Sequence, residues 1–425
     1  MTASALPGQN RTVNAASSRQ HRRGRITLAL WGTYLLLIPV YLGSSGQLQI
    51  ADAALAAVVG THVIATGPTR ALAVPARTYP AIRTGTWFVG YALFVAACWS
   101  FILDDLEPLL YGRYFVYGLG LVVLVASLYL EFGDRLLRAT RWALYLSLVL
   151  VALSVFLDAA PGIRSTGTFN NPNQLGFYAL LTQSSLGVIN GIRPKAELHP
   201  LRLAQYAEGL AWVATGTLAV ASASLGAVAG VSLLFVLNLI GRRRITMQVV
   251  IAVLLVLPII AASPESAALD SVNHRFDRQV SRTDGEVGGV LEERGYDRIG
   301  HYPQYLIFGA GEGLTDRYID SDFHGELHSS PGTLLFSYGL IGTMLFGWFL
   351  LRTVRGAGIV TSLPLLPVVA YSLSHNGLRF RPWWVLLALL IVAAATSARE
   401  ATITRRQRRS TVELGLATRP GRREP

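Results

Sequence analysis

Apolar residues in this chain come in long blocks separated by short polar connections, without an amphipathic rhythm. A helix needs about 20 mostly apolar residues to cross a hydrocarbon core of roughly 30 Å. Because lipid offers the backbone no hydrogen bonds, closely spaced blocks of this kind predict membrane-spanning helices and exclude a soluble fold. We place twelve blocks, at residues 26–43, 48–66, 86–103, 114–130, 142–157, 175–190, 209–223, 225–240, 246–262, 331–351, 358–373 and 382–398.

The predicted fold is therefore all-α: a polytopic integral membrane protein with about twelve transmembrane helices and one long outer loop that carries short helices. Residues 26–262 would form helices one to nine, residues 263–330 the loop, and residues 331–398 helices ten to twelve. The polar tails, residues 1–25 and 399–425, are typical of disordered segments. Composition agrees, since 15% of the residues are charged, against about 25% in soluble domains.

Two further features narrow the interpretation. A basic run at residues 21–25 precedes the first block, as in a signal peptide, but block 26–43 is long for one and a second block follows at once. We therefore expect a retained helix. Cys98 is the only cysteine and lies within a predicted helix, which leaves no disulfide framework and no thiolate metal site.

Basic residues are distributed unevenly between the two sides of the predicted bundle. When the loops are numbered alternately, 27 of the 37 basic residues fall in the two tails and the even-numbered loops. Short cytoplasmic loops carry the positive charge of membrane proteins. Both termini are thus expected in the cytoplasm, and the number of helices should be even. The net charge of +12 is then a topology signal, and no nucleic-acid partner is expected.

Four polar segments are expected on the outer side: residues 104–113, 158–174, 263–330 and 374–381. Long loops in compact domains are usually functional. The last three are rich in Arg, His and Asn, which suit an anionic, oxygen-rich ligand. The glycines of Phe308–Gly313 allow close backbone approach, but the phosphate-loop pattern lacks its preceding strand and following lysine. Ser330 is the expected N-cap of a helix that begins at Pro331.

Four short motifs in these segments, in this order, resemble the O-antigen ligase and O-antigen polymerase superfamily. They are R-S-T-G-T-F-N-N-P-N at residues 164–173, F-G-A-G-E-G at 308–313, His328 with G-L-I-G at 339–342, and H-N-G-L-R at 375–379. Two departures are Ser329, where many members have asparagine, and Leu225, where many have arginine.

The resemblance implies a metal-independent glycosyltransferase of the bacterial inner (cytoplasmic) membrane, with its active site on the outer face and no cofactor. Its donor would be a glycan linked to undecaprenyl pyrophosphate, and its acceptor another glycan or a lipid-linked molecule. The product would be a surface polysaccharide such as O-antigen, exopolysaccharide or capsule. Other expected partners are membrane lipids and further polysaccharide-assembly proteins. Ligase, polymerase and protein glycosyltransferase activities are not distinguished by the sequence.

The resemblance also suggests roles for individual residues. Pyrophosphate is a leaving group that needs charge stabilisation, and arginine supplies bidentate donors for it. Histidine titrates near neutral pH and can deprotonate an acceptor hydroxyl. The candidate catalytic residues are His328 as the base and Arg164 at the leaving group, with Arg379 and Arg298 behind it, and the other expected substrate contacts are His375, Asn173 and Glu326.

Simpler roles stay open for several of these positions. Residues 171–173, Asn-Pro-Asn, at least start a helix. Glu312 and Glu326 could pair with nearby arginines instead of acting as acids. Asp52 and His62 are expected close to the two ends of the second helix, at the membrane interface.

Three other classes of function also stay open. A metal-dependent lipid-sugar glycosyltransferase would use Asp104 and Asp105 as cation ligands. A transporter or flippase for a lipid-linked glycan tends to show internal repeats, broken helices and buried charge, and the sequence shows no repeat. The third is a non-enzymatic partner in a polysaccharide-assembly complex.

Overall fold

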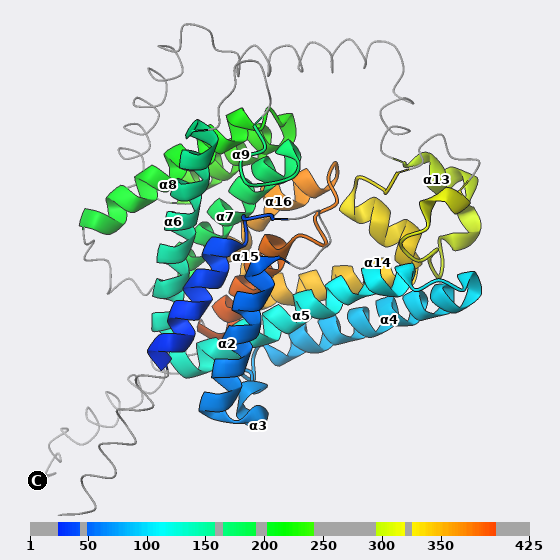
Figure 1. Cartoon of the computed structure of the whole chain (residues 1–425), viewed down its shortest axis with the longest axis horizontal. Coiled ribbons are helices and arrows are strands. Elements are labelled where there is room, and N and C mark those ends of the chain that lie inside the picture. The colour runs from blue at the N-terminus through cyan, green and yellow to red at the C-terminus, as the bar shows by residue number, and fades with distance from the viewer. Residues whose placement is uncertain are drawn as a thin grey trace, which may run out of the picture.

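The computed structural model describes residues 24–42, 49–157, 165–192, 202–241, 295–318 and 325–396, and within these ranges the chain is helical with no strand (Figure 1). Residues 24–37 form the first helix. The others are α2 (Ile50–Thr66), α3 (Pro68–Ala71), α4 (Tyr79–Leu103), α5 (Glu107–Phe132), α6 (Asp134–Leu157), α7 (Pro172–Ile192), α8 (Arg202–Ala221), α9 (Leu225–Gly241), α13 (Asp297–His301), α14 (Ser330–Ala357), α15 (Ile359–Ser362), α16 (Leu365–Ser372) and the helix Arg381–Thr396.

Four of the described helices are long and apolar enough to cross a membrane: α4, α5, α6 and α14. Large apolar side chains are exposed on them, among them Phe101 at 89% and Phe156 at 76%. Exposed apolar surface of this kind suits contact with lipid. The expectation of an all-helical chain with membrane-spanning helices is confirmed, whereas the count of twelve spans stays a prediction.

The apolar blocks coincide with helical segments except for block 246–262, which lies outside the described residues. Two blocks expected as continuous spans are interrupted. Block 358–373 divides into α15 and α16, since Pro364 between them has no N–H to continue the helical ladder. In α14 the backbone leaves helical geometry at Gly339, where φ is 65° and ψ is −175°. Interrupted helices cannot be recognised from hydropathy alone.

Two of the described helices lie inside the bundle. The α4, α5 and α14 helices run side by side, while α7 contacts α6, α8, α9 and α16 (Figure 1). The α7 helix and the helix Arg381–Thr396 are buried on nearly every side, as expected for helices without a polar face. Trp384 packs against Gly118 of α5, where an added Cβ would lie 2.2 Å from the indole ring.

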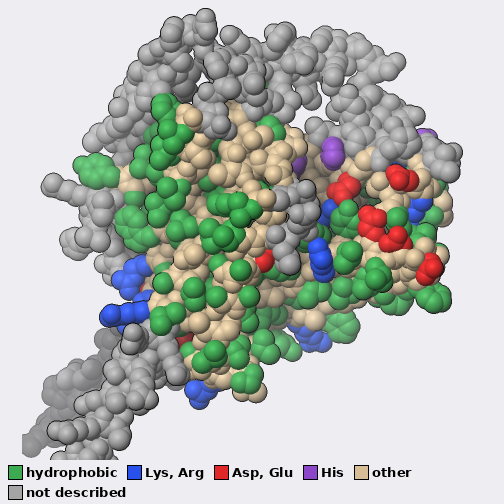
Figure 2. Space-filling model, in the orientation of Figure 1, with side chains coloured by type: hydrophobic (Ala, Val, Ile, Leu, Met, Phe, Trp, Pro, Cys, Tyr) green, Lys and Arg blue, Asp and Glu red, His purple; other side chains and the backbone are tan. Residues whose placement is uncertain are grey.

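Carboxylates gather in one part of the face drawn in Figure 2. In the space-filling view, Asp and Glu gather on the right, near α13, and arginines mark the lower end, near α3 (Figure 2). Asp52 and His62, expected at the membrane interface, both have side-chain partners within the protein. His62 is 1% exposed and its Nε2 lies 2.9 Å from the Ser127 hydroxyl. The Asp52 carboxylate forms an ion pair with Arg381 at 2.7 Å.

The interruption of α14 is filled by the segment 306–311. The backbone N–H groups of Ala310 and Gly311 donate to the carbonyls of Phe336 and Ser337, at 2.8 and 2.9 Å, and Leu340 N donates to Leu306 O at 2.7 Å. The break therefore leaves few backbone groups unsatisfied, as membrane-embedded backbone requires.

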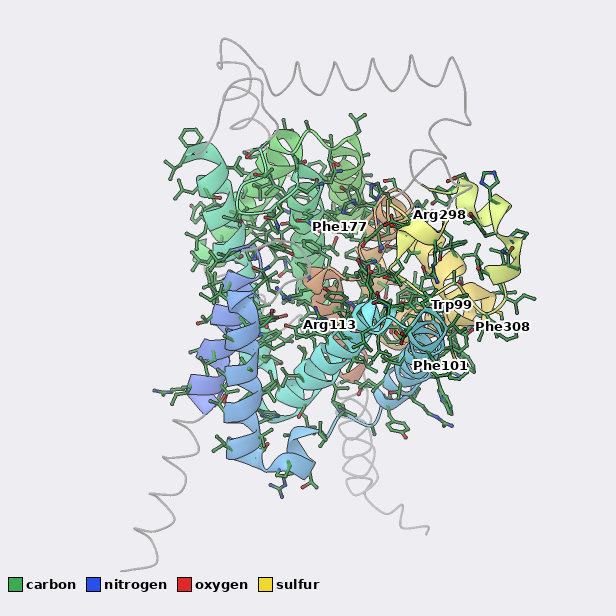
Figure 3. The ribbon with its side chains drawn as sticks, turned by 45° about the vertical axis from the view of Figure 1, so that its right-hand side comes forward. Trp99, Phe101, Arg113, Phe177, Arg298 and Phe308 are labelled. Atoms are coloured by element: carbon green, nitrogen blue, oxygen red, sulfur yellow. The ribbon has the colours of Figure 1, made fainter. Side chains whose placement is uncertain are left out.

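Glycines make this close docking possible. A Cβ on Gly339 would lie 2.2 Å from the Ile307 carbonyl oxygen, and one on Gly309 would lie 2.4 Å from that of Ser337. Trp99 Nε1 also donates to Gly309 O at 3.0 Å, which fixes the segment against α4 beside Phe308 (Figure 3). Gly309 thus serves the backbone contact with α14, whereas a Cβ on Gly311 would lie 2.9 Å from the Trp99 ring and one on Gly313 would lie 2.9 Å from the Tyr111 ring. Close packing accounts for all three glycines without a phosphate ligand.

Candidate functional site

The loop between α16 and the last described helix, residues 373–380, packs against an aromatic side chain of α7. Phe177 of α7 stacks between Tyr371 and Phe380, with ring centroids 4.7 and 5.8 Å apart (Figure 3). A Cβ on Gly377 would lie 2.3 Å from the Phe177 ring, so a side chain there would lift the loop away. This arrangement fixes the backbone between His375 and Arg379.

Two serines lie at the start of α14, and one of them, Ser330, joins it to the same loop. Ser329 is the N-cap, because its hydroxyl accepts from Gly332 N at 3.2 Å, and the expectation of Ser330 in that role was wrong by one residue. Ser330 instead bridges the two segments: its hydroxyl donates to His375 O at 3.2 Å and accepts from Gly377 N at 2.9 Å. The segments around His328 and His375 are thereby brought side by side.

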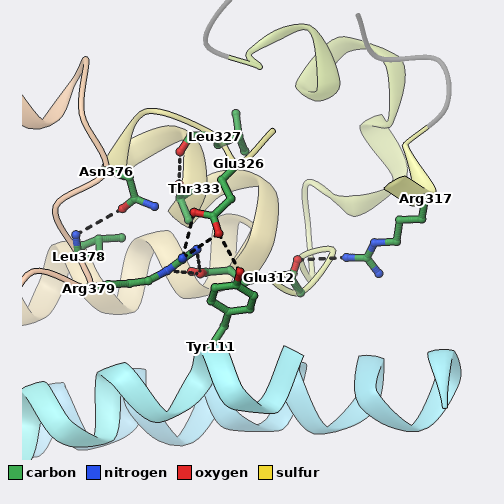
Figure 4. A network of polar contacts seen from close by, with 10 residues as sticks. Tyr111, Glu312, Arg317, Glu326, Leu327, Thr333, Asn376, Leu378 and Arg379 are labelled. Carbon is green, nitrogen blue, oxygen red and sulfur yellow. Dashed lines mark hydrogen bonds and ion pairs between the residues drawn. The ribbon is translucent and has the colours of Figure 1, made fainter. Parts of the chain in front are cut away.

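Arg379 is the centre of a network of ion pairs (Figure 4). Its Nε donates to Glu312 Oε2 at 2.8 Å, and its Nη1 donates to both carboxylate oxygens of Glu326 at 3.0 Å. The Tyr111 hydroxyl donates to Glu326 Oε1 at 2.8 Å, and the guanidinium lies 4.1 Å from the centre of the Tyr111 ring. The alternative that both glutamates pair with an arginine is confirmed.

The network keeps Arg379 and Glu326 ionised. Burial lowers the pKa of Arg379, but Glu312 and Glu326 raise it by more, and the pKa ends above its usual range. Burial raises the pKa of Glu326, but the charge and hydrogen bonds of Arg379, the Tyr111 hydroxyl and nearby His328 leave it below its usual value. At neutral pH Glu326 is therefore an ionised carboxylate paired with the charged guanidinium of Arg379.

A cavity of about 430 Å³ opens beside this network. Its lining includes Glu326, Arg379 and His375 from the predicted site, and the Glu326 side chain is 43% exposed. A cavity with paired charges, tyrosines and amides in its wall can hold a ligand rich in hydroxyl groups. The other lining residues are Tyr41, Glu107, Leu110, Tyr111, Arg113, Tyr114, Gln174, Asn376 and Phe380.

His328 lies at the edge of this group. Its side chain is exposed, and it is close enough to Glu326 for its charge to contribute to the lowered pKa of that carboxyl. Asn173 lies at the start of α7: its N–H donates to Asn171 Oδ1 at 2.8 Å and its carbonyl accepts from the Tyr371 hydroxyl at 3.1 Å. The helix start expected at residues 171–173 is confirmed, and it is Gln174 that lines the cavity.

Of the two other predicted arginines, Arg298 lies within the described residues and is buried. Arg298 is 2% exposed, donates to Gly325 O at 2.5 Å and lies 5.0 Å from the Tyr318 ring centre. Burial lowers its pKa. It supports the chain leading to Glu326 and lies behind the cavity. Arg164 lies outside the described residues, which resume at Ser165, whose N–H donates to Ala221 O at 3.1 Å.

The acidic pair proposed for a metal site occupies the turn between α4 and α5. Asp104 has left-handed backbone geometry, with φ of 50°. Asp105 Oδ1 accepts from Glu107 N at 2.7 Å, so this side chain satisfies the first backbone N–H of α5. Among the described residues no three His, Cys, Asp or Glu side chains form a group that could hold a metal ion.

The sequence interpretation missed the contribution of α5. Tyr111 and Tyr114 line the cavity and Tyr117 donates to Asp52 at 2.8 Å, all from one helix. Their spacing of three residues places them on one face, and this was the available signal.

Comparison with protein-family models found no match, and comparison with curated proteins found none either.

Proposed function

We propose that this chain is a glycosyltransferase of the O-antigen ligase or polymerase type, acting on a glycan linked to undecaprenyl pyrophosphate. The observation that carries the proposal is the convergence of two predicted motifs: Glu326, beside His328, and Arg379, beside His375, share one ion pair and one cavity. The family motifs in the sequence supply the reaction type, and the cavity supplies room for a polar glycan.

The proposed step is a direct displacement. The acceptor hydroxyl oxygen attacks the anomeric carbon of the donor, the bond from that carbon to the pyrophosphate oxygen breaks, and the leaving group keeps the electron pair. His328 takes the hydroxyl proton. Ionised Glu326 stabilises the resulting imidazolium, while Arg379 holds Glu326 in place and is a positioning residue. Arg164, by its motif, would contact the pyrophosphate.

In this proposal the protein lies in the bacterial inner membrane with about twelve spans and both termini in the cytoplasm. Reporter domains fused at residues 77 and 138, beside clustered arginines, should be active on the cytoplasmic side, and one fused at Gly300 should be active outside. A cytoplasmic signal at Gly300 would overturn the orientation.

Two features favour the transporter or flippase alternative. The α14 helix is broken at Gly339, and Asp52 forms an internal ion pair with Arg381, which directly follows the loop 373–380. Against it, the segment 306–311 fills the break with backbone hydrogen bonds. A moving gate would have to break these bonds in each cycle.

Reconstitution in proteoliposomes tests the proposal. With a glycan linked to undecaprenyl pyrophosphate and an acceptor glycan, we expect transferred glycan and an equal amount of released undecaprenyl pyrophosphate, unaffected by a chelator. His301→Ala, an exposed histidine on α13, is the matched control for His328→Ala. Movement of intact donor across the vesicle without release of pyrophosphate lipid would establish the transporter instead.

A further inference from the structure

The stretch 325–329, which carries the proposed base, is held at both of its ends by residues from the start of α13. At one end, the Arg298 guanidinium donates to Gly325 O at 2.5 Å. At the other end, the Tyr296 hydroxyl lies 2.5 Å from the Ser329 hydroxyl. Tyr296 is the N-cap of α13 and Arg298 lies in its first turn. One short helix therefore fixes both ends of the stretch.

The hydroxyl of Tyr296 takes part in two hydrogen bonds but carries one proton. It lies 2.9 Å from Leu373 O, a carbonyl that can only accept, so the proton is donated there. The Ser329 hydroxyl must then donate to Tyr296, while its oxygen accepts from Gly332 N at 3.2 Å. The hydrogen bonds thus run in one direction, from the first turn of α14 through Ser329 and Tyr296 to the first residue of the loop 373–380.

His328 is the exposed residue within the stretch that these contacts hold. Its neighbours Leu327 and Ser329 are 5% and 0% exposed, and Leu327 O accepts from the Thr333 hydroxyl at 3.3 Å. The backbone of Ser329 is extended, with φ of −143° and ψ of 132°. Because successive side chains of an extended chain point to opposite sides, burial of the two neighbours turns the imidazole toward the surface.

We propose that Tyr296 is a positioning residue for His328 in glycan transfer. Tyr296 is not among the residues that line the cavity of about 430 Å³, and it lies outside the four sequence motifs. It acts through Ser329, which directly follows the base, and through the loop 373–380, which carries Arg379. The inference rests on the proposed function and names the contact that holds the base in register with the ion pairs of Arg379.

The substitution Tyr296→Phe tests the inference with little disturbance of packing. It keeps the ring, whose Cε1 atom would lie 3.2 Å from a Cβ on Gly332, and removes both hydrogen bonds. In proteoliposomes with the undecaprenyl-pyrophosphate donor, turnover should fall about 10- to 100-fold with the donor KM unchanged, because a misplacement of about 1 Å can cost 10²-fold. Tyr305→Phe is the matched control, since the Tyr305 hydroxyl makes no hydrogen bond to another described residue.

The same substitution in His328→Gln separates positioning from general damage to the structure. That variant has no base to position, so adding Tyr296→Phe should cause no further loss of turnover. An equal fold-loss in the wild-type and His328→Gln backgrounds would overturn the inference, as would wild-type turnover in Tyr296→Phe alone.

Amide hydrogen exchange tests the contact without any substrate. Tyr296→Phe should speed exchange in peptides that cover residues 326–333 and 373–377, and Tyr305→Phe should not. Absence of glycan transfer by the wild type, together with this faster exchange, would reject the proposed function and leave Tyr296 as the link between the two segments. Unchanged exchange in Tyr296→Phe would overturn the inference, whatever the activity of the wild type.

Discussion

The guanidinium of Arg379 lies 2.5 Å from the carboxylate of Glu312, a side chain that is only 3% exposed. The two residues are 67 positions apart in the sequence. Glu312 directly follows the segment 306–311 that fills the break in α14, so the ion pair ties the end of this segment to the loop that precedes the last described helix. With Glu326 on the same guanidinium, three separate stretches of chain meet at Arg379.

Removal of the Arg379 guanidinium should lower the free energy of unfolding. Arg379→Met would leave two carboxylates without their partner, and breaking a buried pair from one side costs about 3–5 kcal/mol. We expect a clear fall in the thermal unfolding temperature of the detergent-purified protein. Arg355→Met, an exposed arginine near the end of α14, is the control. Adding Glu312→Gln to Arg379→Met should recover part of the loss, and equal melting of Arg379→Met and the control would contradict the role of the network.

The stability contributed by Glu326 should depend on pH. Its folded pKa lies below the usual value of 4.5, so the ionised form stabilises the fold at neutral pH. This contribution is fully present above the usual pKa and is lost as the pH falls through the lowered one. The difference in unfolding temperature between wild type and Glu326→Gln should therefore be constant near neutrality and shrink in acid. A difference that grows in acid would refute the assignment.

The break in α14 should not tolerate a side chain at Gly339. Its φ of 65° disfavours other residues, and a Cβ would lie 2.2 Å from the Ile307 carbonyl. We expect Gly339→Ala to release the segment 306–311, seen as faster limited proteolysis between residues 295 and 318. Gly347→Ala lies in the same helix, where a Cβ meets nothing within 4 Å, and should digest as the wild type does. Equal protection of the two variants would show that α14 does not hold the segment.

The existence of the helices was predictable because it depends on local apolar pattern. The interruptions of the helices were not predictable, because the break in α14 at Gly339 depends on a partner segment that begins more than twenty residues earlier. In the same way, hydropathy cannot show that Asp52 pairs with Arg381, 329 residues away. Burial of these charges depends on tertiary contacts alone.

The candidate site was also predictable only in part from the sequence. The motifs indicated that His328 and His375 belong together, and the hydrogen bonds of Ser330 bring their segments side by side. The pairing of Arg379 with both glutamates could be anticipated only as an alternative. Arg113 and Tyr114 were overlooked because they lie at the boundary between a polar segment and the apolar block 114–130, and only the cavity they line reveals their position.

The central claim is that His328 is the base for glycan transfer, and His328→Gln tests it most directly. A general base contributes about 10²–10⁴-fold to rate. Glutamine can replace a structural hydrogen bond but cannot take a proton, so His328→Gln and His328→Ala should lose activity to the same extent, with donor binding kept. The measurement is transfer of glycan from the undecaprenyl-pyrophosphate donor in membranes at matched expression. The account predicts that both variants fall by about that factor, and near-normal turnover by His328→Gln would contradict it.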